Sequence, residues 1–134
     1  MDKQNNILSI TGVGIDIVDV ARIKKLLENY ESSFLSRTFT QAEIDYCKNC
    51  AYPELHFAAR FAAKEAMVKA LGTGFSGEIT LKSVSVENDP QTSAPIAILD
   101  DFAKQRMNEL GATKMLISLT HLKDYAQAIA ILSK

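Results

Sequence analysis

Near its start the chain changes its hydrophobic period from two residues to about 3.6, as at the passage from a strand to a helix. Val13, Ile15 and Ile17 alternate as in a half-buried strand, so Asp16 projects from the opposite face of that strand. Asp19 is a residue type that caps helices, and apolar residues follow helical spacing after it. The pattern predicts a strand that leads directly into a helix and presents a carboxylate near its end.

A long helix is predicted from about Leu55 to Leu71, because apolar side chains recur there at helical spacing. The stripe consists of Phe57, Phe61, Met67, Val68 and Leu71. Glu65 lies at the edge of this stripe and Lys64 lies inside it, so two charges intrude on a surface that faces the core. Gly72 follows the last periodic residue, where a glycine commonly ends a helix.

The remaining segments predict locally paired strands with helices between them. Thr40 to Glu43 is a capping-box pattern that opens a short helix, and Asp100 caps a later helix that ends at Gly111. Strand patterns occupy 79–81, 84–86, 96–99, 115–120 and 125–132, with the last two joined as a hairpin through 121–124. This order favours a single α+β domain, residues 1–134, with a largely antiparallel sheet packed with helices.

The composition excludes several classes of protein. The chain has 134 residues, 47% of them hydrophobic and 23% charged, as expected for one globular domain. Its net charge of −1 gives no general attraction to nucleic acid. No apolar run approaches the roughly 20 residues that a membrane helix needs, and the start MDKQNNILSI lacks the pattern of a signal peptide. We expect a cytoplasmic protein that binds neither nucleic acid nor membrane.

Three motifs of the chain resemble those of the holo-(acyl-carrier-protein) synthase family, the small bacterial 4'-phosphopantetheinyl transferases. Gly12 to Ile17 resembles the family's GxGxDI, Arg60 to Gly74 its RFAAKEAxxKAxGTG, and Ile117 to His121 its closing SxTH. The motifs occur in the same order across nearly the whole chain. The resemblance implies transfer of 4'-phosphopantetheine from coenzyme A to a serine of apo acyl carrier protein, with release of 3',5'-ADP, for fatty acid biosynthesis.

The resemblance also implies roles for individual residues. Asp16 and Glu65 would bind Mg²⁺ on the pyrophosphate of coenzyme A, and Mg²⁺ in such sites uses one or two protein carboxylates. Together with Lys69, which lies one turn after Glu65 and could meet a phosphate, they are the expected catalytic residues. Contacts to the coenzyme are expected from Lys64, Lys69, Gly72, Gly74, Ser76 and His121. The general base stays open between the two acids and a water activated by Mg²⁺.

The resemblance further implies partners. Family members form homotrimers that bind coenzyme A between adjacent subunits, so a trimer is expected here too. Lys64 would then contact either a ligand phosphate or an acid of a neighbouring subunit. Acyl carrier proteins are acidic, and a chain of net charge −1 needs a local basic patch to attract one. Arg22 and Lys25, on the polar face of the first helix, are the candidates.

Two motifs allow other interpretations. Gly72 to Gly77 matches GxGxxG, but it follows a helix and precedes a strand, the reverse of the order in dinucleotide-binding folds, which argues against a nicotinamide oxidoreductase. Cys47 and Cys50 form a CxxC with only His56 nearby, so we interpret them as free thiols. The remaining alternative is a non-catalytic module that binds coenzyme A or a nucleotide, and retention of both acids argues against it.

Overall fold

The computed structural model describes residues 9–73 and 77–134. In chain order its elements are β1 (Ile10–Asp19), α1 (Val20–Thr38), α2 (Gln41–Lys48), α3 (Pro53–Leu71), β2 (Val84–Asn88), β3 (Pro95–Leu99), α4 (Asp101–Glu109), β4 (Lys114–His121) and β5 (Tyr125–Ser133). One sheet has the order β1-β5-β4 and a second consists of β2 and β3. Each of these pairings is antiparallel, which confirms the expected α+β fold.

Three helix boundaries are set by local capping residues that the sequence predicts. Asp19 accepts a hydrogen bond from the backbone N–H of Ala21 and begins α1 directly where β1 ends. Thr40 and Glu43 form the expected capping box at the start of α2. Gly72 ends α3 in the left-handed conformation at φ 74°, which a glycine adopts without steric cost.

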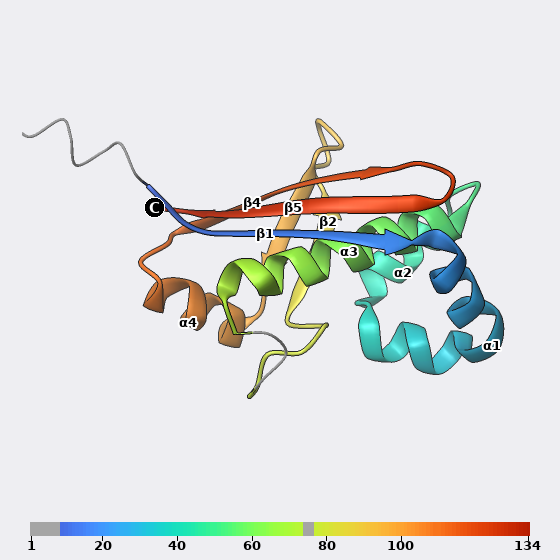
Figure 1. Ribbon diagram of the computed structural model, residues 1–134, viewed down its shortest axis with the longest axis horizontal. Coiled ribbons are helices and arrows are strands. Elements are labelled where there is room, and N and C mark those ends of the chain that lie inside the picture. Colours follow the sequence, from blue (N-terminus) through green and yellow to red (C-terminus); the bar gives the residue numbers. More distant parts are fainter. Residues whose placement is uncertain (1–8, 74–76) are drawn as a thin grey trace, which may run out of the picture.

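α3 is the centre of the molecule. It lies along one face of the three-stranded sheet, with α1 and α2 toward one end and α4 toward the other (Figure 1). The buried surface of α3 is wider than the single apolar stripe that the sequence predicts, because the helix is buried on almost every side. Alanines recur along it at four-residue intervals and are at most 4% exposed: Ala58, Ala62, Ala66 and Ala70. These small side chains allow neighbouring elements to approach the helix closely.

The face of β1 that packs on α3 is the reverse of the one expected. Val13, Ile15 and Ile17 are 56%, 53% and 63% exposed, although alternation of this kind predicts a half-buried surface. Asp16 does project from the opposite face, but that face, which it shares with Gly14, is the one turned toward α3. The expected two-residue period of the strand is therefore confirmed, whereas the expectation of which side is buried is wrong.

The expectation of a strand at 79–81 is also wrong. Thr80 and Ser83 close a turn there, with the backbone N–H of Ser83 donating to Thr80 O at 3.0 Å and that of Thr80 to Ser83 Oγ at 2.9 Å. Leu81 O accepts from the Lys64 ammonium at 3.1 Å. Because these backbone groups are used locally or by a side chain, they are not available for a strand ladder. The strands at β2, β3, β4 and β5 are confirmed.

Candidate active site

The site lies at the seam between β1 and α3, where two glycines bring the strand against the helix backbone. A Cβ atom added at Gly14 would overlap the carbonyl oxygen of Ala66, and one added at Gly12 would overlap that of Ala70. Only glycine fits such a close approach. Polar side chains of the strand and of the helix are consequently held close to each other along this seam.

Asp16 and Lys69 meet at the seam. Lys69 Nζ donates to Asp16 Oδ1 and to Ile15 O, both at 3.0 Å. The Asp16 side chain is 18% exposed and that of Lys69 is 53% exposed, so the ammonium covers the acid from the solvent side. An ammonium has three donors, and two are used here, which leaves one for an anion that approaches from solvent.

Glu65 joins the same cluster from α3. Burial raises the pKa of Glu65 and the negative charge of Asp16 raises it further, while Lys69 and Arg22 lower it by a smaller amount. Each effect follows from the cost of a carboxylate charge in a partly desolvated place beside another acid. The structure thus brings Asp16, Glu65 and Lys69 together, as the sequence analysis expected.

The two carboxylates fit a divalent cation that prefers oxygen. The described residues contain no group of three or more histidines, cysteines or acids that could hold a metal ion, so a site enclosed by protein ligands is absent from residues 9–73 and 77–134. Mg²⁺ on a phosphate substrate needs only one or two protein carboxylates and takes its other ligands from phosphate and water. A cation between Asp16 and Glu65 would also relieve their mutual repulsion.

The expectation that Lys64 contacts the coenzyme or an acid of a neighbouring subunit is wrong. Its ammonium is fully buried and donates to Glu43 Oε1 at 2.6 Å, Val84 O at 2.7 Å and Leu81 O at 3.1 Å. All three donors of the ammonium are therefore used inside its own chain, and none remains for a ligand phosphate or for an acid of a neighbouring subunit. The physical reason is that a lysine inside an apolar stripe needs a buried partner, which α2 supplies.

His121 lies toward the other end of α3. It is the last residue of β4, and its ring packs edge-on against that of His56 with 5.3 Å between the ring centroids. His56 is in the first turns of α3, and Glu65 is nine residues further along the helix. The rise along the helix from His56 to Glu65 is therefore roughly 13 Å at 1.5 Å per residue. Within one chain, His121 is not part of the cluster around Asp16.

The loop after α3 follows a helix, as the sequence analysis noted, and so lacks the order of a dinucleotide-binding fold. Gly72 is at its start, and the expected contacts from Gly74 and Ser76 lie outside the described residues. Arg106 of α4 donates through Nε to Leu71 O at 2.9 Å. This cation at the negative end of α3 is a feature that the sequence analysis missed, because nothing in the local pattern links α4 to the loop.

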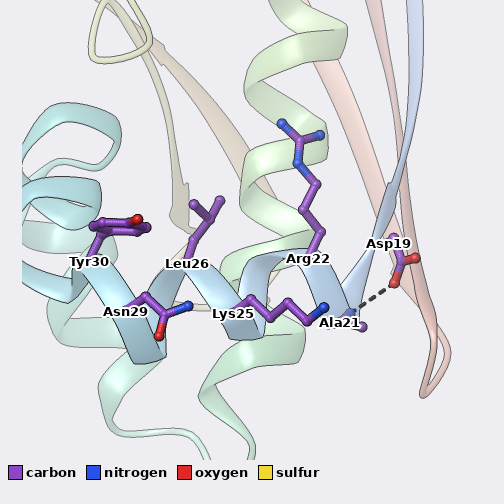
Figure 2. A pocket seen from close by; sticks show the side chains of 7 residues that line it. All are labelled: Asp19, Ala21, Arg22, Lys25, Leu26, Asn29 and Tyr30. Atoms are coloured by element: carbon purple, nitrogen blue, oxygen red, sulfur yellow. Dashed lines mark hydrogen bonds between the residues drawn. The ribbon is translucent and has the colours of Figure 1, made fainter.

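Arg22 and Lys25 line a groove along α1. The groove has a volume of about 350 Å³, and Figure 2 shows both side chains projecting from α1 between Asp19 and Tyr30. The Arg22 guanidinium lies 6.0 Å from the centre of the Phe61 ring and is close enough to Glu65 to lower its pKa. The basic groove and the acidic cluster are therefore adjacent, with Arg22 between them.

The two cysteines lie outside this cluster. Cys47 is fully buried, and burial raises the pKa of its thiol to about 12. Redox and zinc chemistry both need the thiolate, which such a pKa disfavours. This supports the interpretation of Cys47 as a free structural thiol, while Cys50 donates to Tyr46 O.

Comparisons with known proteins show the family to which the chain is similar. Residues 12–130 match the family model of the 4'-phosphopantetheinyl transferase superfamily. The "Holo-[acyl-carrier-protein] synthase" of Syntrophus aciditrophicus is 42% identical over 123 residues, which cover 92% of this chain and 95% of that protein. The crystal structure of the Neisseria meningitidis synthase superposes with a TM-score of 0.84 at 29% identity, covering 93% of this chain and 99% of that one. The Helicobacter pylori synthase, solved in complex with coenzyme A, gives 0.78 at 30% identity, covering 90% and 99%.

Proposed function

The chain belongs to the holo-(acyl-carrier-protein) synthase family of the 4'-phosphopantetheinyl transferase superfamily, and we propose that it transfers 4'-phosphopantetheine from coenzyme A to a serine of apo acyl carrier protein. The observation that carries this proposal is the convergence of Asp16 and Glu65 at the seam between β1 and α3. Both residues lie within the part of the chain that matches the superfamily. The structure of a relative in complex with coenzyme A supports the choice of donor.

In this reaction the serine oxygen forms a bond to the phosphorus that carries pantetheine. The bond from that phosphorus to the bridging oxygen breaks, and 3',5'-ADP leaves with the electron pair, while the serine proton passes to a base. Negative charge grows on the bridging oxygen, so the site must supply positive charge rather than a covalent partner. Lys69 supplies one such charge, and its free donor faces solvent beside Asp16.

Asp16 and Glu65 are the proposed ligands of Mg²⁺. When bound there, the cation would neutralise charge on the pyrophosphate and hold it for in-line displacement. The protein's own contribution is to fix the two carboxylates, which the close glycine contacts at Gly12 and Gly14 achieve. Lys69 holds one oxygen of Asp16, which orients that carboxylate at the seam.

The acidic carrier protein is proposed to dock on the groove of α1. Arg22 and Lys25 give that groove its positive charge, and Arg22 reaches toward Glu65. A carrier bound there would have its serine near the acid cluster. Exposed charges of this kind raise the association rate and make it depend on salt.

A homotrimer with active sites between subunits is the proposed assembly. The outer face of the three-stranded sheet exposes Val13, Ile15, Ile17, Leu116 and Tyr125, each at least 53%. An apolar face of this kind is typical of an interaction surface. His121 lies toward the other end of α3 from Glu65, and in a shared site it would meet a coenzyme that a neighbouring subunit binds. The described residues include no helix that could span a membrane, and we propose a cytoplasmic location.

The function is tested by incubating the protein with coenzyme A, Mg²⁺ and an apo carrier protein, and then measuring the intact mass of the carrier. The proposal expects the carrier to gain one phosphopantetheine group and 3',5'-ADP to appear in equal amount. A carrier whose mass stays unchanged under these conditions, while coenzyme A still binds to the protein, would favour the non-catalytic module.

A further inference from the structure

Lys64 and Glu65 are neighbours in sequence and serve different sides of α3. The Lys64 side chain is buried against α2 and the segment that leads into β2, while Glu65 lies near Asp16 of β1. Successive residues on a helix point about 100° apart, so both placements follow from one rotation of α3 about its axis. Whatever fixes one of these side chains also fixes the direction of the other.

The ion pair of Lys64 with Glu43 joins three separate elements. Glu43 Oε1 accepts from Lys64 Nζ and from the backbone N–H of Thr40, at 2.6 Å and 3.0 Å. Glu43 Oε2 accepts from the backbone N–H of Val86 at 2.9 Å. Through Lys64 the network continues to Val84 O and Leu81 O. α3 is thus tied to the start of α2 and to β2 by hydrogen bonds whose lengths and directions leave little freedom.

A buried ion pair is not needed to hold a fold together. Well-packed apolar residues often stabilise as well, because two buried charges lose their hydration. What a fully bonded pair adds is a defined geometry, since it tolerates less sliding and rotation than an apolar contact. The tip of a side chain lies roughly 6 Å from the axis of its helix, so rotating α3 by about 10° would move the Glu65 carboxylate by about 1 Å.

We propose that Lys64 is a positioning residue, whose buried pair with Glu43 sets the rotation of α3 and thereby the spacing of Asp16 and Glu65. This inference rests on the proposed function, because it assigns to the pair an effect on the cation site. Cation ligands are sensitive to displacements of this size: supporting contacts around a metal site commonly change its affinity 10- to 100-fold, roughly. The role is one of geometry, because Lys64 is too deeply buried to touch a ligand.

The test compares a variant without the ion pair with a variant of similar stability that retains it. Glu43→Gln with Lys64→Met removes both charges, and Met115→Ala, which truncates a buried side chain of β4, serves as the control for general loss of packing. Binding of Mn²⁺ is measured by electron paramagnetic resonance in the presence of coenzyme A and without a carrier protein, so that no turnover occurs. We expect the double variant to bind Mn²⁺ at least tenfold more weakly than the wild type, and Met115→Ala to bind it as the wild type does.

Wild-type Mn²⁺ affinity in the folded double variant would overturn the inference and leave the proposed function intact. If the double variant does not fold, Glu43→Gln alone replaces it, because this change keeps the shape and one acceptor oxygen; it is expected to weaken Mn²⁺ severalfold, and unchanged affinity would again overturn the inference. A wild-type protein that binds coenzyme A but no Mn²⁺ would overturn both, because the cation site itself would then be absent.

Discussion

The two faces of β1 differ sharply in how closely they are packed. On the inner face a single added Cβ atom at Gly14 would collide with the backbone of α3. On the outer face Ile15 and Ile17 are more than half exposed. The inner face has no room for a methyl group and carries the acid of the candidate site, whereas the outer face is apolar and open. Close packing thus positions the acid of the candidate site, and the apolar alternation marks the surface that we propose for association.

The largest effect is expected from filling the inner face. Gly14→Ala puts a Cβ atom on the carbonyl oxygen of Ala66, so β1 and α3 must separate. We expect the free energy of unfolding in urea to fall by about 3 kcal/mol or more, with loss of transfer activity. Gln105→Ala, at an exposed position of α4, is the control and should change stability by less than about 0.5 kcal/mol. A Gly14→Ala protein as stable and as active as the wild type would show that the seam is not closely packed.

The outer face is tested by a charge. Ile15→Asp places a carboxylate at the middle of the exposed apolar surface, opposite Ile129 of β5. We expect a folded monomer with association weakened at least tenfold and with lower activity, because burying an unpaired charge in an apolar interface is costly. Sedimentation velocity measures the assembly and circular dichroism the fold. A wild-type chain that is already monomeric, or a variant that assembles normally, would contradict the role given to this face.

A smaller effect is expected where α1 meets the inner side of the seam. Arg22→Glu should raise the KM for carrier protein roughly tenfold and leave the KM for coenzyme A nearly unchanged, because Arg22 is an exposed charge at the edge of the site. Lys104→Glu, an exposed change of the same charge on α4, is the control. If the two variants have identical KM values for carrier protein, and if wild-type activity does not depend on salt concentration, the carrier docks on another surface.

The smallest effect concerns the stability of the inner face. Because burial and Asp16 raise the pKa of Glu65, its charge costs stability when the pH is above that raised pKa. Glu65→Gln should therefore stabilise the folded chain at neutral pH by less than about 1 kcal/mol, since the site is partly solvated. The gain should fade as the pH falls through the raised pKa and vanish below the ordinary value of 4.5, where the acid is protonated in both states. Thermal melting at pH 7 and pH 4 measures it, and a variant less stable than the wild type at pH 7 would contradict the account.

The parts of the fold that depend on near neighbours were predictable from sequence. Asp19, the capping box at Thr40 and the glycine at Gly72 each act within one helical turn, and all three are confirmed. The meeting of Asp16 and Glu65 was expected from the motifs, and the structure brings the two together. The three caps need no knowledge of distant segments, whereas the meeting of Asp16 on β1 with Glu65 on α3 was expected only from the resemblance of their motifs.

The expectations that are wrong concern contacts between distant segments of the chain. The alternation of Val13 and Ile15 is the same whether the buried face meets α3 or a second chain, so sequence cannot say which side is inside. The partner of Lys64 lies on another helix, and the only signals were a lysine within an apolar stripe and an acid in a capping box. The motif around Lys64 does not include that acid, so the expectation that Lys64 contacts a ligand is wrong.

The central claim is that Asp16 and Glu65 act as one cation site, and the most direct measurement is the rate of phosphopantetheine transfer as a function of Mg²⁺ in Asp16→Asn, Glu65→Gln and the double variant. Each single change should lower the rate roughly 100-fold or more. Residues that act as a unit are not additive, so the double variant should be at most severalfold slower than the worse single variant. Near-normal transfer in either single variant at limiting Mg²⁺, or losses that multiply in full, would contradict a shared site.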